Sequence, residues 1–129
     1  MSFELDISKY IAKTKSNLET GVRNTIFQIA TKLDERSPVD SGHYRLNNQY
    51  GFGTPPSNII EGVDPTGIEA LTIIQEKMNA SPPFGVHYLA NNVPYAQRIE
   101  EGWSGKAPLG VYELTSVEME SIMKEEMAK

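Results

Sequence analysis

Cysteine is absent from the 129 residues of the chain. Its absence excludes disulfide bonds, cysteine-ligated zinc and thiol catalysis, and suits a protein made in a reducing cytoplasm. The chain also has no apolar run near the roughly 20 residues of a membrane-spanning helix. Its first residues, MSFELDISKY, carry acids and lack the apolar stretch of a signal peptide. We therefore expect a cytosolic protein with no membrane partner.

Basic charge is also scarce. The chain has 12 lysine and arginine residues against 17 aspartate and glutamate residues, a formal net charge of -5. A field of this sign repels nucleic-acid phosphates and anionic lipids. The lysines between positions 9 and 15 lie among acidic residues, which is typical of an exposed mixed-charge helical face. The composition therefore disfavours a DNA-contacting factor.

The length and the 39% hydrophobic content predict one globular domain, residues 1–129. A long helix is predicted from Ile7 to Leu33, because apolar residues recur there at intervals of three, four and seven. Gly21 is a weak point at which this helix can bend or break, since glycine costs about 1 kcal/mol relative to alanine. Ser37-Pro38 ends the helix, because the residue before proline is pushed out of the α region.

A strand is predicted over residues 44–52, although Asn48 interrupts its alternation. Residues 53–65, GTPPSNIIEGVDP, form a turn-rich connection that we expect to be mobile, with Ile59-Ile60 holding it to the core. Thr66-Gly67-Ile68-Glu69 matches a capping box and predicts the start of a second helix.

The buried face of that second helix is expected to carry Ile68, Leu71, Ile74 and Met78, and Pro82-Pro83 ends it. The remaining predicted elements are a strand over 85–90, a short helix over 94–101 and a C-terminal helix over about 109–127. The fold class is therefore α+β: a long N-terminal helix and a C-terminal helix packed on a small, mostly antiparallel sheet, with a mobile loop.

Candidate catalytic residues are few. His43 lies in the run DSGH, but neighbours along a turn point apart, whereas a catalytic triad requires side chains that meet in space. His87 lies in a predicted strand, where a lone histidine without an HExxH-type partner is usually structural. The adjacent acids Glu100-Glu101 diverge by about 100° on a helix and cannot flank one substrate bond. We expect them to be solvated or to meet a partner.

The loop GWSGK also fails as a catalytic motif. Lys106 stands where the nucleophile elbow GxSxG requires its second glycine, and the phosphate-binding pattern GxxxxGK[ST] is not met. The sequence therefore predicts no enzyme, no cofactor and no metal site.

The segment NNVPYAQRIEEGWSGKAPLG, residues 91–110, has a composition suited to contact. Trp103, the only tryptophan, is flanked by glycine, and tryptophan is a typical interface anchor, although it can equally fold back onto its own core. Tyr95 and Arg98 lie three residues apart on the predicted short helix. Glu101 and Lys106 place opposite charges beside the loop. These five residues and Leu109 are the candidate interaction residues.

Two segments of the chain resemble the signature segments of tailed-bacteriophage tail-component proteins, the small head-tail joining, tail-completion or neck proteins. They are SPVDSGHYRLNNQYGFG at 37–53 and NNVPYAQRIEEGWSGKAPLGVYELT at 91–115. The family pattern is a helix ending in S-P-V-D-T-G, a strand, then N-x-x-P-Y-A-x-x-x-E-x-G, a loop and a terminal helix after A-P-x-G. The chain follows this order over most of its length, with Ser41 in place of the commoner threonine and His43 in place of a frequent arginine. The matching turn residues are Pro38, Asp40, Gly42, Pro94, Gly102 and Pro108.

The resemblance implies a non-enzymatic structural protein of the virion, placed at the head-tail junction or in the upper tail, and present in the host cytoplasm during assembly. It implies a homo-oligomeric ring, expected to be a hexamer, that contacts neighbouring neck, connector and tail proteins. Genome DNA would pass through the lumen without specific binding. A tail terminator that caps growth of the tail tube is the alternative. A small phage-encoded, host-directed enzyme or binding protein is a further one.

Overall fold

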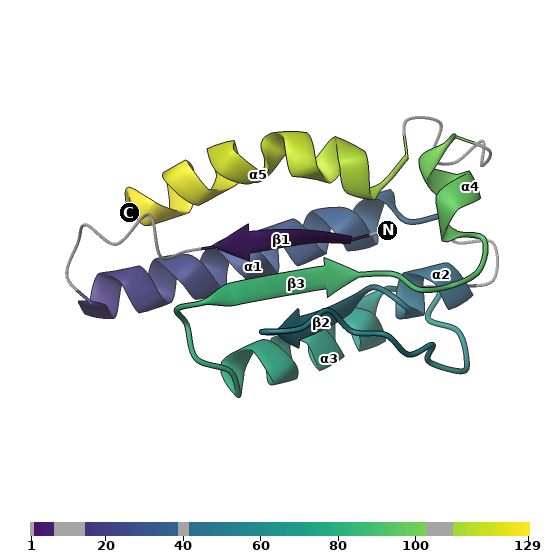
Figure 1. Ribbon diagram of the computed structural model, residues 1–129, viewed down its shortest axis with the longest axis horizontal. Coiled ribbons are helices and arrows are strands. Elements are labelled where there is room, and N and C mark those ends of the chain that lie inside the picture. Colours follow the sequence, from purple (N-terminus) through teal and green to yellow (C-terminus); the bar gives the residue numbers. More distant parts are fainter. Residues whose placement is uncertain (1, 7–14, 39–41, 103–109) are drawn as a thin grey trace.

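The computed structural model describes residues 2–6, 15–38, 42–102 and 110–129 (Figure 1). Over these residues the chain forms three strands and five helices. In chain order they are β1 (Ser2–Asp6), α1 (Lys15–Arg36), α2 (His43–Leu46), β2 (Gln49–Phe52), α3 (Ile68–Asn79), β3 (Val86–Ala90), α4 (Ala96–Glu100) and α5 (Tyr112–Met127). The expected α+β class is confirmed.

The three strands form one antiparallel sheet in the order β1-β3-β2. In the register of the central strand, Tyr88 pairs with Glu4 on one side and with Gly51 on the other. Helices α1 and α3 lie behind the sheet, and α1 runs between α3 and α5 (Figure 1). The expected packing of both terminal helices on the sheet is only partly right, because α5 packs mainly against α1.

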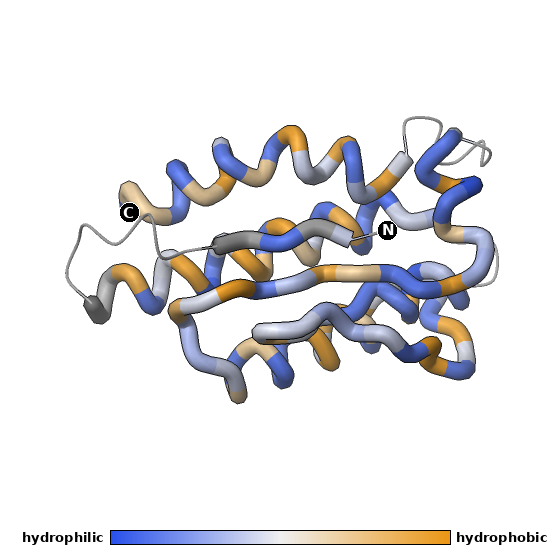
Figure 2. The backbone as a smooth tube through the Cα atoms, viewed as in Figure 1, coloured by the Kyte–Doolittle hydropathy of each residue, from blue (hydrophilic) through white to orange (hydrophobic). Residues whose placement is uncertain are grey.

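Helix α1 supplies much of the core, since its apolar stripe is fully buried. This stripe is Leu18, Val22, Ile26, Ile29, Ala30 and Leu33. The stripe appears in Figure 2 as hydrophobic colour along the helix. The helix passes through Gly21 without a break, and a Cβ atom at this position would lie 2.7 Å from the Met127 sulfur. Glycine at position 21 therefore lets the last turn of α5 approach α1 closely.

The ends of α1 differ from the prediction. Residues 7–14 of the expected helix lie outside the described residues, and the helix continues beyond Leu33 to Arg36. Ser37-Pro38 ends it as expected.

The strand β1 was missed, because SFELD is too short and too acidic to stand out as a strand in the sequence. Its pairing partner β3 lies 80 or more positions away, which no local pattern reveals.

The strand predicted over 44–52 is wrong in its first half. Gly42, at φ 83°, begins a single helical turn, in which the Leu46 amide donates to the Gly42 carbonyl at 3.0 Å. Tyr44 and Leu46 are both buried in this turn. Apolar residues two positions apart are also the pattern of a strand, which explains the wrong prediction. A short helical turn can bury both residues when neighbouring elements cover more than one of its sides.

The connection between β2 and α3 is held by side-chain amides. Asn47 accepts from the Ile60 amide at 2.7 Å and donates to the Ile60 carbonyl at 3.0 Å. Gln49 and Asn92 both donate to the Asn58 carbonyl. The expectation that Ile59-Ile60 anchors this connection through apolar burial is wrong for Ile59, whose side chain is 43% exposed.

Helix α3 also begins differently from the prediction. Asp64, and not a Thr66 capping box, supplies the main cap: its carboxylate accepts from the Gly67 amide at 3.0 Å and from the Ala70 amide at 2.8 Å. Thr66 contributes one long contact, from the Ile68 amide at 3.4 Å. Ile68 is exposed, so the buried face consists of Ala70, Ile74 and Met78, with Leu71 partly buried.

Candidate functional site

The two segments that carry the family resemblance meet at one end of the molecule. Asn91, after the last residue of β3, donates to the Tyr44 carbonyl at 2.8 Å and to Asn48 Oδ1 at 3.1 Å. These bonds join positions more than 40 residues apart and are fully buried. We call the group formed by Asn48, Asn91, Tyr112 and Ser37 the asparagine network.

Asn48 connects the rest of this network. Its Oδ1 also accepts from the Tyr112 hydroxyl at 2.9 Å, and its Nδ2 donates to Ser37 Oγ at 2.8 Å. Ser37 Oγ in turn donates to the Leu33 carbonyl in α1. Asn48 was interpreted from the sequence as an interruption of a strand. The structure shows that Asn48 links the ends of α1 and β3 to α5. These bonds satisfy both the donor and the acceptor of its buried amide, as burial requires.

Glu100 is the second polar link at this end. Its carboxylate accepts from the amides of Val111 at 3.1 Å, Tyr112 at 2.6 Å and Glu113 at 3.2 Å. These amides belong to the first turn of α5, where backbone donors are unsatisfied and negative charge is favourable. Glu100 was expected to be solvated or to meet a partner; it instead caps the C-terminal helix of its own chain from the end of α4.

An ion pair completes the polar end. Asp34, 4% exposed near the end of α1, accepts from Arg45 Nε at 3.2 Å and from Arg45 Nη2 at 3.1 Å. Arg45 also donates to the Pro65 carbonyl, so the pair ties α1 and α2 to the connection before α3. Burial raises the pKa of Asp34 to about 6, against the opposing effect of Arg45.

The candidate interaction residues that are described lie on the surface of this end. Tyr95, the residue before α4, is 37% exposed and its ring lies 6.5 Å from both His43 and Tyr44. Arg98 and Glu101 are exposed on α4 and directly after it. Glu101 also accepts from Gln97 at 3.4 Å. The structure therefore gathers these three on one exposed corner.

The other candidate residues divide into two groups. Trp103, Lys106, Leu109, Asp40 and Pro108 lie outside the described residues. Of the turn residues, Pro38 is buried, Pro94 is exposed, and Gly102 ends the α4 segment at φ 82°. Gly42 is required at its position, because a Cβ atom there would lie 2.7 Å from the Pro65 nitrogen, at a φ that side chains disfavour.

Both histidines make structural hydrogen bonds. His43 Nδ1 lies 2.8 Å from the Gly62 carbonyl oxygen. His87 is buried, with its ring nitrogens 2.6 Å from the Tyr50 hydroxyl and 2.8 Å from the Pro83 carbonyl. Burial lowers the pKa of His87. Each ring thus joins a turn or strand to its neighbour. Among the described residues, the hydrogen-bond partners of His87 are a phenol and a backbone carbonyl, with neither a serine nor a carboxylate.

One buried polar atom at this end stands out. The Tyr44 hydroxyl is buried without a hydrogen-bond partner among the described residues. Burial, followed by the nearby Glu100 charge, raises the pKa of this phenol. The hydroxyl therefore stays protonated and can donate to an acceptor that reaches it.

Comparisons with protein-family models, curated proteins and solved structures found no match to this chain. Within the part of the chain that the structure describes, no group of three or more histidine, cysteine, aspartate or glutamate side chains is placed to hold a metal ion. None of the helices there has the length and hydropathy needed to cross a membrane.

Proposed function

We propose that the chain is a structural virion protein of a tailed bacteriophage, which joins head and tail as a tail-completion or neck component. In this proposal copies of the chain form a ring that contacts neighbouring neck, connector and tail proteins. The proposal starts from the resemblance of residues 37–53 and 91–115 to that family. It includes no catalytic step and no cofactor.

The observation that carries the proposal is the convergence of these two segments. Asn48 and Asn91, one from each, share a buried hydrogen bond. A motif whose polar residues satisfy one another inside the fold has a structural purpose, since each buried amide left unpaired would cost about 1–3 kcal/mol. The motif residues thus explain the shape of this end, which leaves Tyr95, Arg98 and Glu101 on its surface.

The exposed apolar residues near this corner favour a contact role over a solvated one. Ile59 and Val63, in the connection before α3, and Ile68, at the start of α3, are all exposed. Side-chain hydrogen bonds from Asn47, Gln49 and Asn92 hold residues 56–60 of this connection, so little conformational entropy would be lost when Ile59 contacts another protein. We assign this connection and the α4 corner to neighbouring virion proteins.

Quantitative mass spectrometry of purified virus particles from the source tests the proposal. On the order of six to twelve copies per particle, counted against the major capsid protein, is the expected result for one or two rings. Absence of the chain from the particles would overturn the proposal. It would favour a host-directed binding protein or enzyme, for which His43 and His87 would be the first residues to change.

A tail terminator remains the second candidate within the same structural class. It differs in position, since a terminator sits on the last ring of the tail tube. Immunogold labelling of tails purified without heads separates the two: label at the end of free tails supports the terminator, and label confined to complete particles supports the joining protein.

A further inference from the structure

Residues 56–60, in the connection between β2 and α3, are held by side chains that bind their main chain. Asn47 Nδ2 donates to the Ile60 carbonyl at 3.0 Å, and Asn47 Oδ1 accepts from the Ile60 amide at 2.7 Å. Two positions further along the chain, Gln49 Nε2 donates to the Asn58 carbonyl at 2.8 Å. A step of two positions forward at β2 thus meets a step of two positions backward in the connection. Residues 56–60 therefore run antiparallel to β2.

The same alternation continues at Pro56. A Cβ atom on Gly51 would lie 2.9 Å from Pro56 Cδ, which is the next pair in this register. The Pro56 carbonyl also accepts from Asn92 Nδ2 at 2.8 Å. The carbonyls of residues 56, 58 and 60 are therefore all directed toward the body of the protein. This period of two is that of an extended chain, in which successive residues direct their main-chain polar groups to opposite sides.

The main-chain groups of Ser57 and Ile59 are consequently directed outward. Both residues are exposed, and their amides and carbonyls have no hydrogen-bond partner among the residues that the structure describes. On the same side of the chain, Pro55 has no amide hydrogen to donate. Gly62, at φ 112°, ends the extended run. Residues 57–59 are thus a short, unpaired strand edge, which we call the 57–59 edge.

The 57–59 edge is fixed by groups that are themselves buried. Asn47 is 0% exposed and Gln49 is 2% exposed, so the two side chains that hold the segment are packed inside the fold. An extended chain that bound here would therefore lose little of its binding free energy to ordering the edge. An unpaired strand edge is also a template for pairing with another extended chain.

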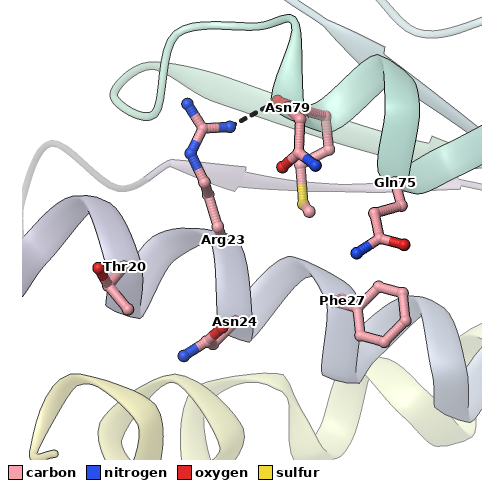
Figure 3. A pocket seen from close by; sticks show the side chains of 7 residues that line it. Thr20, Arg23, Asn24, Phe27, Gln75 and Asn79 are labelled. Atoms are coloured by element: carbon pink, nitrogen blue, oxygen red, sulfur yellow. Dashed lines mark hydrogen bonds between the residues drawn. The ribbon is translucent and has the colours of Figure 1, made fainter.

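The recess between α1 and α3 is a different kind of surface (Figure 3). Its volume is about 270 Å³, and the side chains that line it are partly polar and partly apolar, among them Asn24, Gln75, Asn79, Phe27 and Met78. Side-chain amides such as these can rotate, whereas the 57–59 edge offers main-chain donors and acceptors at the spacing of a strand. The edge therefore specifies the chemistry of its partner more closely than the recess does.

We propose that the 57–59 edge binds an extended segment of a partner protein, which adds to it as a β-strand. The segment exchanges main-chain hydrogen bonds with Ser57 and Ile59. Ile59 and Glu61 are two positions apart, so their side chains lie on one face of the extended chain. An apolar side chain of the partner packs on Ile59, which is 43% exposed. A basic side chain lies near Glu61, the only charged residue in the sequence from 53 to 63.

The partner is a different protein and not a second copy of this chain. Antiparallel pairing of two copies centred on Asn58 would set Pro55 of one copy opposite Glu61 of the other. Pro55 offers Glu61 neither an amide hydrogen nor a positive charge, so the pairing could not continue past the edge. The inference rests on the proposed function in taking this partner to be a neighbouring virion protein, and adds how the two bind.

Amide hydrogen exchange of the isolated chain, measured residue by residue by NMR, tests the strand addition. The probe is the peptide Lys-Val-Thr-Val-Thr-Val-Lys, N-methylated at both threonines so that it pairs through one edge only. At millimolar probe, exchange of the Ser57 and Ile59 amides should slow by about tenfold or more. Exchange of the Val63 amide, in the same connection, should stay unchanged. The matched control peptide is N-methylated at the valines as well and should slow neither amide.

A pair of variants at one position measures the contribution of the main chain. Ser57→Pro removes the outward amide hydrogen and should weaken binding of the probe by about tenfold. Ser57→Ala loses the same hydroxyl but keeps the amide hydrogen, so its affinity should stay within about twofold of the wild type. Circular dichroism checks that both variants fold. Equal affinities of the two variants would contradict a main-chain contact at Ser57.

Three outcomes of the exchange experiment would overturn the inference. Unchanged exchange at Ser57 and Ile59 with millimolar probe would show that the edge does not accept a strand. Equal slowing by the fully methylated peptide would show contact without main-chain pairing. Slowing at both amides when the chain alone is concentrated would identify a second copy as the partner.

These results separate the inference from the proposed function. Slower exchange with the probe in a chain that is absent from virus particles would refute only the virion role. A Ser57→Pro chain that is counted in the particles at the wild-type number, and that binds the probe as the wild type does, would refute only the strand addition.

Discussion

The polar links at one end of the molecule differ in kind from the contact between α1 and α5 at the other end. At the end where α2 and α4 lie, the elements are joined by buried amides, a helix-capping carboxylate and an ion pair. At the opposite end, α1 and α5 meet through apolar packing, with Gly21 against Met127. We call the end at α2 and α4 the polar end. Its stability depends on hydrogen-bond geometry, since each hydrogen bond requires a particular distance and angle. The contact of Gly21 with Met127, which we call the apolar end, depends mainly on how closely the two helices can approach.

This difference shows where the chain can tolerate change. A buried polar group whose partner is removed pays a desolvation cost of about 1–3 kcal/mol, whereas the flexible Met127 side chain can move to accommodate a change at Gly21. We therefore expect the polar end to respond more strongly to single substitutions. That end also presents Tyr95, Arg98 and Glu101, so its rigidity would position the surface that we assign to contact.

Asn91→Ala is expected to have the largest effect. It removes the donor to the Tyr44 carbonyl and to Asn48 Oδ1 and leaves a small cavity at a fully buried site. We expect the free energy of unfolding to fall by about 3 kcal/mol. Urea denaturation measures it, with Asn92→Ala as the control, because Asn92 is half-buried and donates only to the connecting segment. A loss below that of the control would contradict the importance of the asparagine network.

The Asp34–Arg45 pair should give the next largest effect, which depends on pH. Burial raises the pKa of Asp34 from its usual 3.8 to about 6, so the folded state binds this proton more tightly than the unfolded chain. Protonation therefore favours the folded state, and stability falls as pH rises from about 4 to about 6. The expected change is on the order of 2 kcal/mol.

The comparison with Asp34→Asn isolates this change, since asparagine cannot titrate. The unfolding free energy of the wild-type chain minus that of the variant should decrease between pH 4 and pH 7. Glu35→Gln, on the exposed side of the same helical turn, is the matched control. A difference that increases with pH would mean that Arg45 outweighs burial and holds the pKa of Asp34 below its usual value.

Glu100→Ala should have a smaller effect at the same end. The substitution removes the acceptor for three amides in the first turn of α5, and the cost of losing such a cap is about 1–2 kcal/mol. Thermal unfolding followed by circular dichroism measures it. Glu101→Ala is the control, because Glu101 is exposed and, among the described residues, accepts only from Gln97. Equal effects of the two substitutions would place the cap elsewhere.

Much of the fold could be predicted from the sequence where a regular apolar pattern extends over many residues. The apolar stripe of α1, the end of that helix at Ser37-Pro38 and the strand β3 follow from local patterns. The polar end could not be predicted in the same way. Asn48 looked like a defect in a strand and Glu100 like a solvated acid, because their partners lie 43 and 11 or more positions away.

Of the candidate interaction residues, Tyr95, Arg98 and Glu101 are exposed at and beside α4, and their role in contact stays a prediction. The role of Asp64 as the cap of α3 was missed, although an aspartate shortly before a helix is a known capping signal. The recess between α1 and α3, lined by Asn24, Phe27, Gln75 and Met78, could not be foreseen, since it depends on how separate helices pack.

Gly21→Ala tests the apolar end and should give the smallest effect. Alanine gains about 1 kcal/mol of helix propensity over glycine. The added Cβ would lie 2.7 Å from the Met127 sulfur, which must move, although the methionine side chain is flexible and can shift at little cost. The two effects nearly cancel, so we expect the unfolding free energy to change by less than about 1 kcal/mol. The double variant with Met127→Ala removes the clash and should be more stable than Met127→Ala alone. If Gly21→Ala instead destabilised the chain as much as Asn91→Ala, the apolar end would be as dependent on geometry as the polar one.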